Sequence, residues 1–169
     1  CNADGEYSEK SAGNYNGVNN DAMLLLSQAF DDPSYEQHVI RNLHMMLTYW
    51  EPDDSIFTAN STRFDKDRLV YPDGYYLHYL TMGVRYNIPE FLSMANYIYD
   101  VLREKNIPSP DYLMDMMNHP ELRDCEWEHS GTPKEYHAFY ADSGIARVRK
   151  GNYSYTVMRD KSNFLYVHN

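Results

Sequence analysis

The 169-residue sequence predicts a mainly α-helical protein with an antiparallel β region at its C-terminal end. Apolar residues recur at helical spacing in several stretches before residue 120, which is the pattern of amphipathic helices. Proline-containing connectors separate these stretches, as expected at helix boundaries. After Glu135 the pattern changes to period-two alternation, which is typical of strands. We therefore expect a helical region over residues 1–135 and the start of an antiparallel β domain over 136–169.

The helices follow from their start and stop signals. Asn14 is a suitable N-cap for a helix that continues to Phe30. Asp32 and Pro33 then suit the N-cap and first position of a second helix, which we expect to end near Trp50. Further helices are expected over residues 74–86, 89–105 and 111–118.

Two predicted helical hairpins have a similar layout. Asp32-Pro33-Ser34-Tyr35 opens one helix and Ile88-Pro89-Glu90-Phe91 opens another, with apolar residues at matching positions further on. Repeated antiparallel hairpins suggest an α/α toroid or a helical solenoid.

Three short strands are expected near the end of the chain. Tyr153, Tyr155 and Val157 alternate with polar or smaller residues, and Gly151 marks a turn before them. The expected ranges are Ser143–Arg149, Tyr153–Arg159 and Asn163–His168. Because a three-stranded meander is a poor domain unless it packs on something, we expect the chain to be a fragment of a longer protein.

Composition excludes several classes of partner and cofactor. The net charge is −10 and the pI is about 5.0, which argues against a nucleic-acid partner. No run approaches the ~18 apolar residues of a membrane span. Two cysteines, Cys1 and Cys125, are too few for a disulfide scaffold, and none of the seven histidines has metal-ligand spacing. We expect no metal and no cofactor, and the sequence leaves the oligomeric state undetermined.

The most informative segment is the polar run from Asp4 to Asn20. It is rich in Gly, Asn, Glu and Tyr, and it leads directly into the first predicted helix. Loops that open onto helix N-termini are where catalytic and binding groups collect. Tyrosine is also abundant, at 17 of 169 residues. Its flat apolar face and hydroxyl suit sugar rings, although tyrosines also pack between helices.

The run from Asp4 to Asn20 resembles the loop-to-helix segment of heparinase II/III-type polysaccharide lyases. That family has a DG-x-x-x-E stretch followed by a tyrosine at the mouth of an α/α toroid, and here Asp4-Gly5, Glu9 and Tyr15 fit it. Residues 61–65 resemble the family less specifically. The resemblance implies an α/α toroid followed by a β-sandwich, and cleavage of an acidic, uronate-containing polysaccharide by β-elimination. It also favours a periplasmic or extracellular location.

The resemblance assigns roles to individual residues. β-Elimination needs a group that neutralises the uronate carboxylate, a base and an acid. Tyr15 matches the family's loop tyrosine and is the candidate catalytic residue. A phenol is protonated at neutral pH, so a tyrosine can act as an acid without a change in its pKa. The base role would require surroundings that lower this pKa. The candidate substrate-binding residues are Glu9, Asn14, Asn19, Asn20 and Arg63.

Each of these residues also has a purely structural interpretation. Asn14 could simply cap the helix, while Asn19 and Asn20 could be solvated. Glu9 could complement the helix dipole. Arg63 could fork onto a uronate carboxylate, or it could pair with Asp65 at the surface.

Two other functions remain open. A non-catalytic carbohydrate-binding module fits the acidic composition better, since a lyase acting on an anionic polymer needs a local basic patch. A helical scaffold that binds a protein partner is the third interpretation. The lyase is favoured for the parent protein, of which this chain alone is expected to be an incomplete and inactive part.

Overall fold

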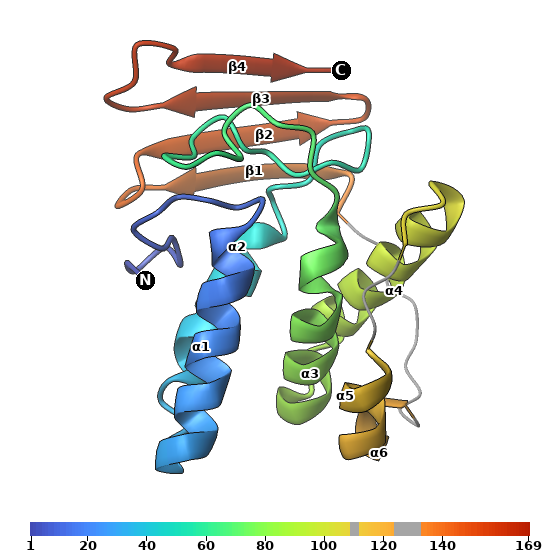
Figure 1. The fold of residues 1–169 in the computed structure, drawn as a ribbon. Helices are drawn as coiled ribbons and strands as arrows, with labels where there is room; N and C mark the ends of the chain where they lie inside the picture. Colours follow the sequence, from blue (N-terminus) through green and yellow to red (C-terminus); the bar gives the residue numbers. More distant parts are fainter. Residues whose placement is uncertain (109–111, 124–132) are drawn as a thin grey trace. The chain divides into compact units, whose positions relative to one another are not determined.

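The computed structural model describes residues 1–108, 112–123 and 133–169, and it shows helices followed by a C-terminal antiparallel sheet (Figure 1). The expected mixed fold with C-terminal strands is confirmed. Cys125, His129 and the predicted helix start at Asp111 lie outside the described residues. The chain divides into two compact units. Unit 1 comprises Cys1–Tyr71 and Pro133–Asn169, and unit 2 comprises Pro72–Thr132.

Unit 1 begins with two helices. Helix α1 spans Tyr15–Phe30 as expected, whereas α2 spans Glu36–Met46 and is shorter than predicted at both ends. At its start, Asp32 Oδ1 accepts a hydrogen bond from Ser34 N at 2.9 Å, so the chain turns before the helix begins. At its end, Trp50 forms an antiparallel bridge with Ile56, and this bridge holds the following residues in a turn.

Helix α1 exposes apolar side chains and buries polar ones, which is the opposite of a simple amphipathic helix. Its apolar stripe is exposed, with 54% of Val18 and 65% of Leu25 accessible. Its buried residues are polar and bond to α2 or the preceding loop. Ser27 Oγ donates to Glu36 Oε1 at 2.9 Å, and Asn20 Nδ2 donates to Asn42 Oδ1 at 3.1 Å. Hydrogen bonds therefore fix how these two helices pair.

The sheet of unit 1 is a four-stranded antiparallel meander in the order β1-β2-β3-β4. The three predicted strands are present within a few residues of their expected bounds. The strand β1 was not predicted. The bounds are β1 Glu135–Tyr140, β2 Ile145–Lys150, β3 Tyr153–Met158 and β4 Leu165–His168.

The two faces of the sheet differ in chemistry. The exposed face carries two rows of mainly apolar residues that cross all four strands. The rows are Phe139–Ala146–Val157–Leu165 and His137–Val148–Tyr155–Val167. The buried face is unusually polar, since β2 and β3 contribute Arg147, Arg149, Ser154 and Thr156 to it. Buried polar groups need hydrogen-bond partners, and Arg147 bonds to Thr156 on the same face and to Glu51 in the turn after α2.

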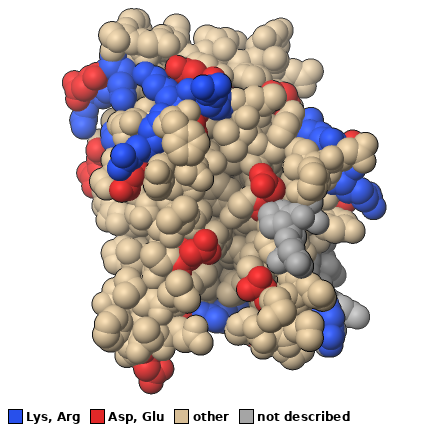
Figure 2. Space-filling view, in the orientation of Figure 1, with Lys and Arg blue, Asp and Glu red and all other residues tan. Residues whose placement is uncertain are grey.

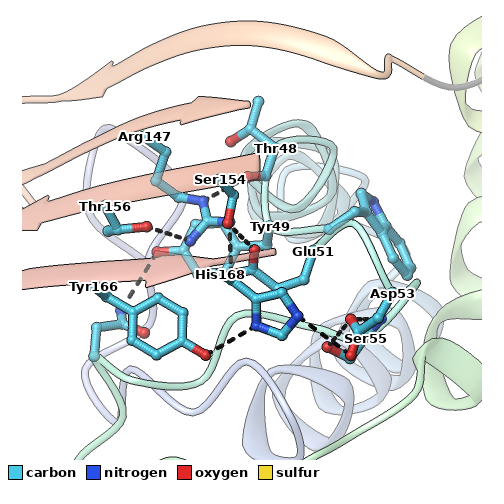
Figure 3. Close-up of polar contacts among 12 residues, drawn as sticks. Thr48, Tyr49, Glu51, Asp53, Ser55, Arg147, Ser154, Thr156, Tyr166 and His168 are labelled. Carbon is cyan, nitrogen blue, oxygen red and sulfur yellow. Dashed lines mark hydrogen bonds and ion pairs between the residues drawn. The ribbon is translucent and has the colours of Figure 1, made fainter. Parts of the chain in front are cut away.

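Arg147 joins the buried face of the sheet to the turn after α2 (Figure 3). Its side chain is fully buried and pairs with Glu51 Oε1 at 3.1 Å. Arg147 Nε donates to Thr48 O, and Nη1 donates to Thr156 Oγ1, each at 2.7 Å. Ser154 Oγ donates to the other Glu51 oxygen. The guanidinium also lies 4.1 Å from the Phe57 ring centroid, so charge, hydrogen bonds and ring contact act together.

A second set of polar contacts attaches the outermost strand, β4. His168 Nε2 lies 3.4 Å from Asp53 Oδ2, and His168 Nδ1 lies 3.3 Å from the Tyr166 hydroxyl (Figure 3). Ser55 Oγ donates to Asp53 Oδ1 at 2.6 Å and fixes the carboxylate. The turn after α2 therefore contacts β2, β3 and β4 through side chains.

Unit 2 is helical. It contains the 3-10 turn η1 (Pro72–Tyr75) and the predicted hairpin α3 (Tyr76–Tyr86) and α4 (Pro89–Glu104). At Gly83 an added Cβ would lie 2.6 Å from Leu92 Cδ2, so the glycine permits the close approach of α3 to α4. The short helices α5 (Leu113–Asn118) and α6 (Pro120–Arg123) follow.

Charged side chains are mixed on the face shown in Figure 2. Lys and Arg gather at the upper left of the view, with Asp and Glu among them. Within the described residues, no helix is both long and apolar enough to cross a membrane.

Replacing Arg147 with Ala tests the connection between the sheet and the turn after α2. The variant leaves Glu51 buried without its cation, so we expect the free energy of unfolding to fall by about 3–5 kcal/mol. Urea unfolding followed by circular dichroism measures the loss. Arg159→Ala is the matched control, because its side chain is 64% exposed beside Asp160 and its loss should stay below about 1 kcal/mol. Equal losses in the two variants would contradict this role of Arg147.

Candidate functional site

Two loops of unit 1 meet at the buried carboxylate of Asp65. Ser11 Oγ donates to Asp65 Oδ1 at 2.8 Å, and the Gly13 amide donates to Oδ2 at 2.9 Å. From the second loop, Ser61 Oγ donates to Oδ1 at 2.6 Å. Only 2% of Asp65 is exposed. The expected alternative of a surface pair between Asp65 and Arg63 is therefore replaced by a buried hydrogen-bonded junction.

The same junction fixes the start of α1. Ser11 Oγ accepts a hydrogen bond from the Tyr15 amide at 3.2 Å, and so satisfies one of the free N–H groups of the first turn. Asn14 occupies the N-cap position as predicted, but its exposed side chain makes no capping hydrogen bond. Tyr15 is thus held at the first position of the helix by Ser11 and Asp65.

The two loops also meet at Glu9. Its carbonyl oxygen accepts hydrogen bonds from Thr62 N at 3.3 Å and Thr62 Oγ1 at 2.7 Å. Its carboxylate accepts a bond from Asn19 Nδ2 at 3.4 Å and lies 3.9 Å from Arg63 Nη2. Hydrogen bonds from its own backbone amide, Ser8 and Asn19, together with the Arg63 charge, lower the pKa of Glu9.

Arg63 and two aromatic rings complete the cluster. The Arg63 Cζ atom lies 5.2 Å from the centroid of the Tyr15 ring, within cation–π range. Phe64 meets the Tyr15 ring edge-on at 6.2 Å, and 70% of Phe64 is exposed. The structure therefore brings four predicted residues into one chain of contacts: Asn19, Glu9, Arg63 and Tyr15.

Asn20 has a different position. It is fully buried, with its Oδ1 accepting from the Tyr7 hydroxyl at 2.9 Å and its Nδ2 donating to Asn42. Asn42 Nδ2 in turn donates to the Gly5 carbonyl at 2.9 Å. At Gly5, φ is +101° and an added Cβ would lie 2.3 Å from the Arg41 carbonyl oxygen, so only glycine fits. Asn20 therefore supports the loop and is closed to a ligand.

An open groove of about 400 Å³ lies beside the cluster. Its volume is within the range of small-molecule sites. Its described lining residues are mostly polar: Cys1, Asn2, Glu6, Tyr7, Ser8, Glu9, Lys10, Asn19 and Asp142.

Glu6 and Glu9 line this groove in contrasting environments. Burial raises the pKa of Glu6, although Lys10 Nζ at 3.4 Å and Asn60 Nδ2 at 2.9 Å oppose the rise. The pKa of Glu9 is lowered instead. One groove thus holds a carboxyl that retains its proton more readily and another that loses it more readily, which is the pattern useful for proton transfer.

Comparison of the chain with models of known protein families, with curated proteins and with solved structures found no match.

Replacing Asp65 with Ala tests whether this junction holds the two loops together. The change removes the acceptor of three hydrogen bonds to a buried carboxylate, so we expect a loss of about 2–4 kcal/mol in the free energy of unfolding. Asp100→Ala is the control, because that carboxylate is 45% exposed and its pair with Arg103 lies on a helix surface. Asp65→Ala should lower the free energy of unfolding several times more than Asp100→Ala does. Similar losses in the two variants would contradict the role of Asp65 as a junction.

The two glutamates should titrate in a fixed order. Carbon-detected NMR of the side-chain carboxyls should give Glu6 a pKa above 4.5 and Glu9 one below it. Because the folded protein holds the Glu6 proton more tightly than the unfolded chain, the stability from this proton is present at low pH. It is lost as the pH rises through the folded pKa of Glu6. Glu6→Gln should remove this part of the pH dependence, and the reverse titration order would contradict it.

Proposed function

We propose that this chain is part of a polysaccharide lyase that cleaves a uronate-containing polymer by β-elimination. The observation that carries the proposal is the position of the Arg63 guanidinium, 5.2 Å from the centroid of the Tyr15 ring. A carboxylate-binding cation and a proton-donating hydroxyl are two of the three groups that this reaction requires.

Arg63 is suited to the substrate carboxylate. Its side chain is 49% exposed, and its contact with Glu9 is long, at 3.9 Å. The planar guanidinium can therefore turn a fork of N–H donors towards an incoming carboxylate. Neutralising that charge makes the sugar C5–H more acidic, which lowers the barrier to its removal.

In the proposed reaction Tyr15 takes the acid role, because a phenol is protonated at neutral pH. A base removes the C5 proton, the C–H electron pair forms the C4–C5 double bond, and the C4–O bond breaks. The departing glycosidic oxygen then takes the hydroxyl proton of Tyr15. No described residue is assigned the role of the base here.

The proposed larger fold is an α/α toroid followed by a β-sandwich. Two helical hairpins, α1–α2 and α3–α4, support the first part. The apolar exposed face of the sheet supports the second, because a sandwich buries such a face beneath another sheet.

A non-catalytic carbohydrate-binding module is the second candidate. The exposed Phe64 ring beside Tyr15 favours it, since aromatic faces pack against sugar rings. The carboxylates of Glu6, Glu9 and Asp142 along the groove also favour it, because they suit sugar hydroxyls better than a polyanion.

Tyr15→Phe and Arg63→Gln distinguish these two functions. For a lyase, Tyr15→Phe should lower turnover by about 10²–10⁴-fold with little change in binding, because it removes only the acid. Arg63→Gln should weaken binding and turnover together. Absorbance of the new double bond measures turnover, and calorimetry with a uronate oligosaccharide measures binding.

The control is Arg68→Gln, an exposed arginine in the same loop, which should leave both quantities unchanged. Full turnover by a folded Tyr15→Phe variant would reject the lyase proposal. Binding without turnover in the parent protein would favour the carbohydrate-binding module.

A further inference from the structure

A small cavity lies inside unit 1, behind the loop that carries the candidate site. Its volume is about 10 Å³, and two buried amides form part of its wall. One is Asn16, in the first turn of α1, and the other is Asn60, in the loop after α2; they are 4% and 2% exposed. The other lining residues are Glu6, Lys10, Ala12, Met45, Met46 and Tyr49.

Each amide uses its NH₂ group but leaves its oxygen without a partner. Asn16 Nδ2 donates to Met46 Sδ at 3.6 Å, and Asn60 Nδ2 donates to Glu6 Oε1 at 2.9 Å. Within the part of the chain that the structure describes, neither Asn16 Oδ1 nor Asn60 Oδ1 accepts a hydrogen bond. Native proteins rarely leave buried acceptors unpaired, so two of them around one cavity indicate a shared donor.

We propose that one water molecule binds in this cavity and donates one hydrogen to each of these two oxygens. The cavity has room for about one water, and buried waters commonly make three hydrogen bonds. Lys10 can supply the third, because its ammonium has three donors and pairs with Glu6 Oε2 at 3.4 Å. The same positive charge disfavours a metal ion, since two cations repel strongly at short range.

This water would bridge the two segments that carry Tyr15 and Arg63, on their buried side. Asn16 directly follows Tyr15, and Asn60 directly precedes the segment from Ser61 to Asp65 that carries Arg63. Asp65 joins the same two segments elsewhere. The water would connect these two segments whatever ligand the site takes, so the inference stands apart from the proposed function.

A crystal structure that resolves ordered water tests the proposal directly. It should show one peak within about 3 Å of both Asn16 Oδ1 and Asn60 Oδ1. In solution, the Asn60 side-chain amide protons should show a nuclear Overhauser effect to a long-lived water. Three results would each overturn the proposal. The first is an absence of density, and the second is an Asn16 amide turned so that its NH₂ meets Asn60 Oδ1. The third is an ion at metal-ligand distances.

Asn16→Leu provides the matched test, because leucine has a similar branched shape but no acceptor. The water peak and the Overhauser effect should both be lost. Gln28→Leu, on the exposed part of α1, should retain both. A water that persists at full occupancy in Asn16→Leu would overturn the proposal, and the wild-type measurement alone decides if this variant does not fold.

Discussion

The buried ion pair between Arg147 and Glu51 is the interaction on which unit 1 depends. Removing two charges from water is costly, and the cost is recovered only when nearly every donor and acceptor is paired. Here the guanidinium bonds to a backbone carbonyl, a carboxylate and a hydroxyl, and it also faces an aromatic ring. These partners lie in the turn after α2 and in β3. The ion pair therefore holds the turn against the sheet, although the two are far apart in the sequence. The strands and the helices of unit 1 are therefore joined by polar chemistry as well as by apolar packing.

The candidate site is built on this frame by a second buried carboxylate. Asp65 binds the loop before α1 and the loop after α2, and it thereby sets Tyr15 beside Arg63. The Tyr15 and Arg63 side chains lie nearer the surface, with Tyr15 half-buried and 49% of the Arg63 side chain exposed. The general arrangement is a rigid, hydrogen-bonded interior that presents a few exposed side chains in fixed positions, as binding and catalysis both require.

Periodicity and turn signals predicted the helices α1 to α5 and three of the four strands, because these patterns are local, but they missed the short helix α6. They missed β1 (Glu135–Tyr140), although Tyr136, Ala138 and Tyr140 form a half-buried face, because the exposed Phe139 interrupts the apolar–polar alternation. They also could not show that Arg147 faces inwards, since its partner Glu51 lies 96 residues away. At the site, the resemblance selected Tyr15, Glu9, Asn19 and Arg63, which do lie together. It could not show that Asn20 is buried or that Asp65 is a junction, because both depend on long-range contacts.

We propose that the Arg63 guanidinium contacts the uronate carboxylate and that the Tyr15 hydroxyl contacts the glycosidic oxygen. The most direct measurement is a crystal structure of the protein with a bound uronate oligosaccharide. We expect the sugar carboxylate to lie on the Arg63 guanidinium and the Tyr15 hydroxyl to lie within hydrogen-bond reach of the scissile oxygen. An oligosaccharide bound elsewhere, with Arg63 still beside Glu9 and no contact to Tyr15, would contradict it.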